Sequence, residues 1–321
     1  GTYYSAYLQD RATLFGKLVI TPGLRFTRYD RTSTGYLEPR IAASLEVATG
    51  VRLKGSWGRN NQYVNRIVRE DVLGGNREFW ALSDGDLVAV PQSTNLVAGA
   101  SYESGDFLID AEAFRNEQTR LTTFAPRFTP GDEGIDYDEY FYEGDGESEG
   151  LELLLQKRFG SHTGWVSYTL SKTDYFFPEL EADPFPADHD QRHELKLVYS
   201  ARLRSLTLSG VYIYGSGRPY TEPIGTEEIA LGSDERSFTV ERVVVGEKNG
   251  ARLPSYQRLD LSANLDFELF SGQGTLGLTV FNVGDRANVW YREFNSVDGE
   301  IFENNILLMS RTYNLFLNVR F

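Results

Sequence analysis

The chain has 321 residues, with 46 acidic and 32 basic side chains that give a formal net charge of −14, and it contains no cysteine. The lack of cysteine excludes disulfide-stapled folds and thiolate metal sites, and the acidic balance disfavours a nucleic-acid partner because phosphates would repel the chain. Uninterrupted apolar runs such as Ile306–Met309 fall far short of the roughly 20 residues that a membrane-spanning helix needs, so a β-barrel is the one membrane class left open.

Strand-like sequence begins at the N-terminus itself. No basic segment followed by an apolar segment precedes it, so no signal peptide is visible. We therefore expect Gly1 to be the start of a mature, processed or truncated chain. Alternation of polar and apolar residues continues along the chain and predicts long strands. There are thirteen of them, at about 2–14, 16–29, 36–48, 51–62, 93–104, 106–120, 149–159, 162–173, 191–201, 205–215, 256–270, 273–284 and 309–321.

The clearest alternation runs through residues 256–270. Arg258 and Asp260 fall on one face with other polar residues, and Leu259 and Leu261 fall on the opposite apolar face. This stretch is about twice as long as the usual strand of five or six residues. Long strands of this kind are typical of barrels that cross a membrane.

Connections between the predicted strands alternate in length. Short turns lie near residues 15–16, 49–50, 105, 160–161, 202–204 and 271–272, and longer loops lie near 30–35, 63–92, 121–148, 174–190, 216–255 and 285–308. Short turns at one end and long loops at the other are typical of outer-membrane barrels. Strand-like pieces inside the loops, Val240–Val245 and Val289–Phe294, predict hairpins above the membrane. Propellers and solenoids are disfavoured because no repeat of about 20–50 residues is present, and strand length disfavours a soluble sandwich.

In a membrane barrel the polar face of each strand points into the lumen, which is the interior of the barrel. The alternation then places charges of both signs on the inner wall. A water-filled pore or a plug domain that hydrogen-bonds to the wall would suit such a surface. The residues expected to face it include Arg40, Arg52, Glu112, Glu152, Lys196, Arg258 and Asp260.

Several stretches resemble the C-terminal barrel portion of TonB-dependent outer-membrane transporters. They are GLELLLQKRFGSHTGWVSYTLSKT (150–173), DHDQRHELKL (188–197), SGVYIYGSGRPY (209–220), LGLTVFNVGDR (276–286) and SRTYNLFLNVRF (310–321), with YLEPRIAASLEV (36–47) and VRLKGSWGRNNQ (51–62) as an earlier hairpin. The resemblance implies an all-β, antiparallel up-and-down transmembrane barrel in the bacterial outer membrane, with short periplasmic turns and long extracellular loops. It also implies that Phe321 is recognised by the barrel-insertion machinery.

The chain departs from the family pattern in two ways. The family has an N-terminal plug domain and a TonB-contacting segment, which are absent here, and its barrel has twenty-two strands. The last strand should end on the periplasmic side, so an odd number of strands means that the first strand begins on the extracellular side. Single-chain bacterial barrels instead have an even number of strands, with both chain ends on the periplasmic side. We expect residues 1–321 to form one barrel domain that supplies the last thirteen of twenty-two strands. The alternative is a complete barrel of about fourteen strands, one of which has been missed.

Two groups of residues suggest metal sites. His189 and His193 lie on one short stretch, but hydrogen bonding at a strand mouth explains them better than a metal does. Residues 132–149 include nine acidic side chains, and no Lys or Arg occurs between residues 128 and 156. Oxygen-rich loops can hold calcium, so Asp132, Asp136 and Asp138 are weak calcium candidates against a solvated acidic loop. We expect no other cofactor.

Candidate ligand-binding residues are aromatic, arginine and amide side chains in the long loops or near the extracellular mouth, because such groups bind ligands by stacking and hydrogen bonding. They could equally pack loops together or contact a lid protein. They are Asn60, Gln62, Asn116, Tyr140, Tyr175, Arg218, Tyr220, Trp290 and Tyr291. No catalytic motif is present, so we expect no enzymatic activity.

The resemblance implies uptake of a scarce nutrient (a siderophore, vitamin, glycan or peptide) by energised transport. Its implied partners are the lipid bilayer, a plug domain and remaining strands from upstream residues or another chain, the TonB complex acting through the plug, and an extracellular lipoprotein lid. Two alternatives remain open. One is a structural barrel subunit of a larger outer-membrane assembly, and the other is a passive porin-like channel of about fourteen strands.

Overall fold

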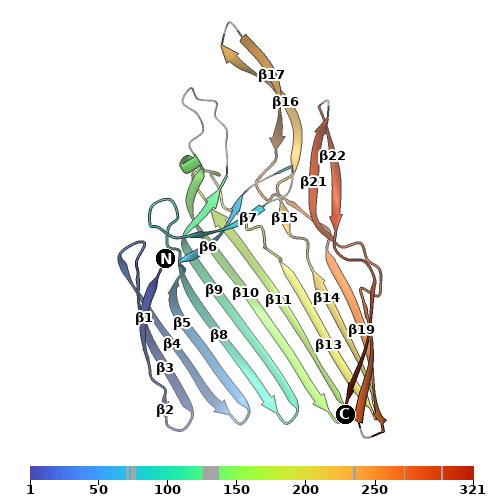
Figure 1. Cartoon of the computed structure of the whole chain (residues 1–321). Coiled ribbons are helices and arrows are strands. Elements are labelled where there is room, and N and C mark those ends of the chain that lie inside the picture. Colours follow the sequence, from blue (N-terminus) through green and yellow to red (C-terminus); the bar gives the residue numbers. More distant parts are fainter. Residues whose placement is uncertain (70–71, 74–76, 126–136, 234–235, 271, 298) are drawn as a thin grey trace.

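A single large antiparallel sheet forms the body of the molecule in a computed structural model that describes residues 1–69, 72–73, 77–125, 137–233, 236–270, 272–297 and 299–321 (Figure 1). All thirteen predicted strands are present in the sheet, the first one interrupted at residues 10–11. In chain order they are β1 (Tyr3–Gln9) with β2 (Ala12–Leu14), β3 (Leu18–Tyr29), β4 (Thr34–Ala48), β5 (Val51–Asn61), β8 (Gln92–Ser104), β9 (Phe107–Phe124), β10 (Phe141–Phe159), β11 (His162–Phe176), β13 (His193–Leu203), β14 (Leu206–Gly215), β19 (Tyr256–Leu269), β20 (Gly272–Phe281) and β23 (Thr312–Arg320).

Each long strand pairs with its neighbours in chain order, so the sheet is an up-and-down meander. At its two ends the meander stays open. Within the described residues, β1 and β2 pair only with β3, and β23 pairs only with β20. The thirteen predicted strands therefore form an open sheet with two unpaired edges among the described residues.

Turns and loops segregate to opposite ends of the sheet, as predicted (Figure 1). The short connections include 15–17, 49–50, 105–106 and 160–161. The long connections gather at the other end together with the N-terminus, while the C-terminus lies at the short-turn end. The two termini thus lie at opposite ends of the sheet, as an odd number of strands requires (Figure 1).

The long loops contain further short strands. They are β6 (Val64–Arg69), β7 (Arg77–Leu82), β12 (Phe185–Pro186), β15 (Pro219–Tyr220), β16 (Pro223–Ser233), β17 (Arg236–Val245), β18 (Ala251–Arg252), β21 (Val289–Val297) and β22 (Glu300–Leu307), with one 3-10 turn, η1 (Tyr137–Tyr140). The β16–β17 and β21–β22 hairpins stand above the sheet (Figure 1), which confirms both predicted hairpins. No helix among the described residues is long and apolar enough to cross a membrane.

One loop prediction was partly wrong. Residues 141–149 belong to β10 and are not part of a free acidic loop. They pair with the ends of β9 and β11, including Tyr142 with Thr123 and Asp145 with Phe176. Strand pairing here overrides the weak intrinsic β-propensity of Glu, Asp and Gly.

Outward-facing side chains form an apolar band. Leu261 on β19 lies opposite Gly210 on β14 and Val280 on β20, which in turn lies opposite Tyr313 on β23. The next outward row joins Leu208, Ala263, Leu278 and Leu315. Leu261 is 45% exposed and Leu315 is 70% exposed. An exposed apolar surface that repeats from strand to strand fits lipid and not water.

The inward face is polar and carries ion pairs. Lys54 on β5 contacts Asp110 on β9 at 2.7 Å and also pairs with Glu112. Gly99 on β8 lies between these strands, where an added Cβ would be 2.7 Å from the Ala111 carbonyl oxygen and 2.9 Å from Glu112 Cγ. Glycine at this position therefore leaves room for the charged side chains of both neighbours to meet.

Candidate ligand cavity at the loop end

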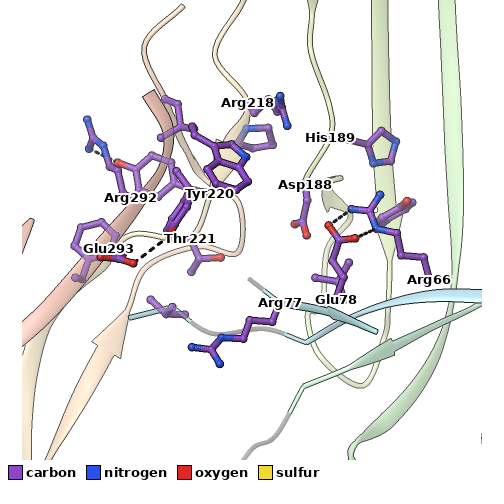
Figure 2. A pocket seen from close by; sticks show the side chains of 18 residues that line it. Arg66, Arg77, Glu78, Asp188, His189, Arg218, Tyr220, Thr221, Arg292 and Glu293 are labelled. Carbon is purple, nitrogen blue, oxygen red and sulfur yellow. Dashed lines mark hydrogen bonds and ion pairs between the residues drawn. The ribbon is translucent and has the colours of Figure 1, made fainter. Parts of the chain in front are cut away.

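A cavity of about 640 Å³ lies among the long loops. Its walls come from the β6–β7 hairpin, the 177–192 loop, residues 218–221 of the next loop, and β21. In Figure 2, Arg66, Asp188 and His189 lie on one side, and Tyr220, Arg292 and Glu293 lie on the other. The volume falls in the range of roughly 300–1,000 Å³ that is usual for small-molecule sites.

Four arginines line the cavity, and they differ in how their charge is compensated. Arg66 forms a two-point contact with Glu78, with Nε 2.5 Å from Oε2 and Nη2 donating to Oε1 at 2.6 Å (Figure 2). Arg292 Nη1 pairs with Glu303 at 3.0 Å. Arg77 and Arg218 have no carboxylate partner within the described part of the chain, so their guanidinium groups are available to a ligand.

Aromatic rings form the second component of the cavity. Tyr220 stacks on Phe294 with centroids 6.2 Å apart, and it accepts a hydrogen bond from Arg292 at 2.6 Å. Trp290 meets the edge of Tyr291 at a centroid distance of 5.1 Å and is 55% exposed. Together these groups offer flat apolar faces and polar tips to a ligand.

The ionisable groups respond to this crowded environment. Burial lowers the pKa of His189 from its usual value, and the nearby Arg66 and Arg218 act in the same direction, against Asp188 and Asp190. Burial also raises the pKa of the Tyr220 hydroxyl, although Arg292 acts against that change. Both groups are therefore held neutral at physiological pH, and each can act as a hydrogen-bonding group toward a ligand.

The structure brings five of the nine predicted ligand residues together in this cavity: Tyr175, Arg218, Tyr220, Trp290 and Tyr291. The other four do not line it. Asn60 and Asn116 lie on the inner wall of the sheet, the Gln62 amide donates to the Val64 carbonyl at 2.7 Å, and Tyr140 is buried against Phe124. Whether any of the nine contacts a ligand stays a prediction.

Sequence reasoning missed Arg66, Glu78 and Arg292 as cavity residues. The first two lie on β6 and β7, inside a stretch taken as one long loop. The β-branched residues of Val64–Arg69 (VNRIVR) and the aromatic residues of Arg77–Leu82 (REFWAL) are typical of strands and are a signal that could have revealed this hairpin. The neighbour of this hairpin could not be predicted from the sequence, because β6 lies beside the end of β9, where Arg69 pairs with Phe124.

The seven residues predicted to face a plug share the inner face of the sheet. Residues directly opposite each other on paired strands point to the same face of the sheet. Glu112 lies opposite Glu152, and Lys196 and Arg258 both lie opposite Ile213. Arg40 donates to Gln9 at 2.7 Å, and Arg258 pairs with Asp260 at 2.9 Å. Arg52 lies opposite Glu46 on the same face. Phe321 is 90% exposed at the short-turn end.

The histidines serve as hydrogen-bonding and packing groups. His193 Nδ1 lies 2.8 Å from the Tyr168 hydroxyl, and His189 contacts the Tyr175 ring edge-on at 6.0 Å. No cluster of three or more His, Asp or Glu that could bind a metal occurs in the described ranges. The calcium candidates Asp132 and Asp136 lie outside the described residues, and Asp138 lies in η1.

Residues 1–283 match the model of a protein family described as TonB dependent receptor-like, beta-barrel. Among solved structures, the chain resembles the ferric enterobactin receptor of Pseudomonas aeruginosa, with a TM-score of 0.62 and 15% identity over 99% of this chain and 44% of that one. It also resembles the ferric yersiniabactin uptake receptor of Yersinia pestis, with a TM-score of 0.61 and 13% identity over 99% of this chain and 45% of that one.

A third similar structure is the outer membrane transporter YddB of Escherichia coli, with a TM-score of 0.61 and 11% identity over 98% of this chain and 44% of that one. The chain therefore spans less than half the length of the solved structures that it matches. No curated protein matches it. The matched family and these structures are receptors and transporters, not enzymes.

Proposed function

The chain belongs to the TonB-dependent receptor-like β-barrel family and is a protein of the bacterial outer membrane, and on this premise we propose that it forms the C-terminal wall and ligand-binding loops of an energised nutrient transporter. The nutrient binds in the cavity at the extracellular end and then passes through the lumen. Its class is a siderophore, vitamin, glycan or peptide. The proposal gives the chain no catalytic role.

The observation that carries this proposal is the position of the cavity. Loops from four separate parts of the sequence gather at one end of the sheet (Figure 1), and they bring exposed arginines and aromatic rings to one space of about 640 Å³. A ligand held there by Arg218, Tyr220 and Trp290 would lie at the entrance of the lumen. Such a site can select a ligand before the lumen opens.

Partners are proposed on the same basis. A plug domain in the lumen would meet the inward ionic residues, which include Arg40, Glu112 and Asp260, and would transmit the action of the TonB complex. Further strands would pair with the free edges of β1 and β23, since lipid does not tolerate unpaired backbone groups. Phe321 would be recognised by the barrel-insertion machinery, and the tall β16–β17 and β21–β22 hairpins would meet an extracellular lipoprotein lid. A calcium ion at the acidic residues around Asp138 is a further proposal.

Uptake by cells tests the proposed function. The complete polypeptide is expressed in a bacterium that lacks its own nutrient receptors of this family, with and without an intact TonB gene. Radiolabelled iron(III) chelates, cobalamin, oligosaccharides and oligopeptides are then supplied at low concentration. We expect saturable uptake of one class that is lost without TonB. Uptake that is unsaturable and independent of TonB would contradict the proposal and would favour a passive channel.

Two variants connect this uptake to the cavity. Arg218→Gln together with Tyr220→Ala should raise the half-saturation concentration of uptake at least about tenfold, because a charged and a stacking contact are both lost. Arg202→Gln is the matched control, since Arg202 pairs with Asp266 at 3.2 Å near the short turns, far from the cavity. Equal half-saturation concentrations for both variants would mean that the cavity does not bind the transported nutrient.

A further inference from the structure

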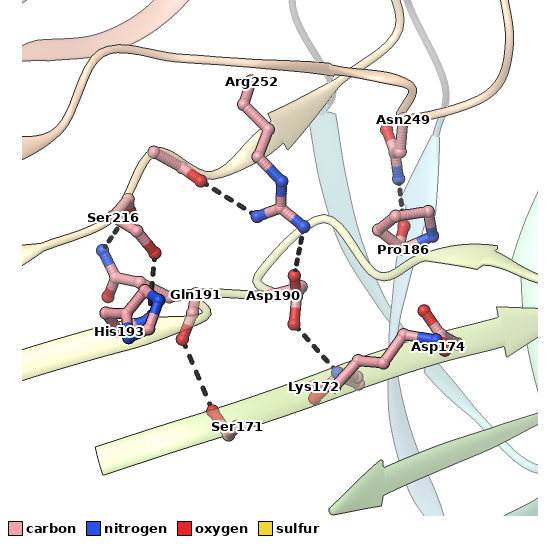
Figure 3. Close-up of polar contacts among 12 residues, drawn as sticks. Ser171, Lys172, Asp174, Pro186, Asp190, Gln191, His193, Ser216, Asn249 and Arg252 are labelled. Carbon is pink, nitrogen blue, oxygen red and sulfur yellow. Dashed lines mark hydrogen bonds and ion pairs between the residues drawn. The ribbon is translucent and has the colours of Figure 1, made fainter. Parts of the chain in front are cut away.

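One short turn ties together the two loops that form facing walls of the cavity. It comprises residues 247–252, near the end of the 216–255 loop, and ends in β18, which pairs with β15. It inserts between the 185–191 segment and the 217–221 segment (Figure 3). Asn249 and Arg252 are not among the residues that line the cavity, although Leu253, which directly follows the turn, is. The turn therefore acts on the cavity through its neighbours.

Asn249 makes the first set of contacts. Its side chain is 3% exposed, and its amide donates to Asp188 Oδ1 at 2.7 Å and to the Pro186 carbonyl at 2.8 Å. On the other side, the Asn249 backbone N–H donates to Thr221 Oγ1 at 3.1 Å. Asp188 and Thr221 both line the cavity, on different loops. One buried residue thus joins the two walls directly.

Arg252 makes the second set of contacts. Its guanidinium donates to Asp190 Oδ2 at 2.6 Å and to the Gly217 carbonyl at 3.1 Å (Figure 3). Asp190 is 2% exposed, and its other oxygen accepts a hydrogen bond from the Thr173 backbone N–H at 2.9 Å. This chain of bonds fixes the loop that carries His189 to the wall strand β11 and to the loop that carries Arg218. A buried carboxylate with these partners is held in a single geometry.

We propose that the 247–252 turn is a brace that sets the spacing of the two cavity walls, with Asn249 and Arg252 as the positioning residues for Asp188, His189, Arg218 and Tyr220. This role rests on the proposed function of the cavity. A ligand site binds tightly only when its polar groups are already held in place. The two residues that hold them here do not touch the ligand space, so they adjust affinity through geometry alone.

Distance measurement between the two walls tests the brace. The chain has no cysteine, so cysteines introduced for exposed Asp183 and Ile224 in the complete polypeptide can carry two spin labels, one on each loop. The label-to-label distance distribution is then recorded by electron paramagnetic resonance in native membranes. We expect one narrow distribution for the parent protein, because both loops are fixed to the same turn.

Asn249→Gly is the most informative variant. Asn249 has φ = +54°, a conformation that glycine adopts without strain, so this change removes the two amide hydrogen bonds and leaves the backbone path intact. We expect the distance distribution to broaden at least about twofold, as it should for Arg252→Ala, because one of the two sets of contacts that join the loops is then lost. Arg252→Lys retains a cation opposite Asp190 and should give an intermediate width.

Arg286→Ala is the matched control, because Arg286 also donates to a loop carbonyl, that of Ser255 at 3.1 Å, but its hydrogen bonds among the described residues reach neither the 185–191 segment nor the 217–221 segment. Its distribution should equal that of the parent. Unchanged distributions in Asn249→Gly and Arg252→Ala would overturn the brace. Since the measurement needs no nutrient, it can fail while TonB-dependent uptake succeeds, and it can succeed while uptake fails.

Discussion

His189 shows how a single residue connects the cavity to the surrounding loops. It follows Asp188, which Asn249 holds, and precedes Asp190, which Arg252 and the Thr173 backbone hold. Its own ring contacts the Tyr175 ring edge-on and lines the cavity. The sequence suggested hydrogen bonding or, less strongly, a metal at His189. The fold instead places His189 in the cavity wall, with both neighbours fixed.

Acid should loosen the loop that carries His189. The pKa of His189 in the folded protein is lowered below its usual value of 6.5, so the unfolded loop binds a proton more readily than the folded one. The resulting contribution to loop stability is complete above about pH 6.5 and is lost as the pH falls through the lowered pKa. Hydrogen–deuterium exchange of residues 177–192, corrected for the intrinsic exchange rate, should therefore rise between about pH 7 and pH 5.

His189→Gln provides the comparison, because glutamine does not titrate. We expect this variant to show no rise in corrected exchange across the same interval. If the parent and His189→Gln change equally with pH, another group controls the loop and the assignment to His189 is wrong.

The positions of the long strands were the feature of the structure that the sequence predicted best. Alternation over 256–270 and 309–321 located β19 and β23 to within three residues, because lipid and lumen impose opposite requirements on successive side chains. Residues 141–148 were missed as strand because Glu, Asp and Gly carry no apolar alternation. Their β structure comes from pairing with β9 and β11, which is a tertiary effect.

The cavity was less predictable than the strands for the same kind of reason. Tyr220 and Trp290 could be chosen by residue type, but their proximity depends on how the 216–255 loop and the β21–β22 hairpin pack. Arg66 reaches the site only because β6 pairs with β7 and lies beside β9. Contacts between loops far apart in sequence leave no local periodicity in any one of them.

Opposite faces of β19 should respond differently to the same substitution. Leu261→Arg places a guanidinium in the outward apolar band and should destabilise the barrel by about 2–4 kcal/mol near the middle of the membrane. Ser262→Arg places it on the inner polar face, between Ser209 and Thr279, and should cost less than about 1 kcal/mol. The measurement is the midpoint of denaturant-induced unfolding of each variant in lipid vesicles. Equal losses would mean that the assignment of the two faces is wrong.

The whole molecule is an open, curved sheet with a charged inner face and two unpaired edges among the described residues. Both features suit contact with further protein. The inner wall presents ionic groups such as the Lys54, Asp110 and Glu112 cluster, and the backbone of β1 and β23 is unpaired on one side within the described ranges. In a membrane such edges need partners. The family match and the coverage of less than half of the similar receptor structures agree with a wall that is one part of a larger barrel.

A cryo-electron microscopy structure of the complete polypeptide, purified from its own membrane, is the most direct test of this account. We predict a closed barrel in which β1 and β23 each pair with additional strands, a plug domain that contacts Arg40, Glu112 and Asp260 from the lumen, and ligand density beside Arg218 and Tyr220. A closed barrel formed by direct pairing of β1 with β23 around an empty lumen would contradict it.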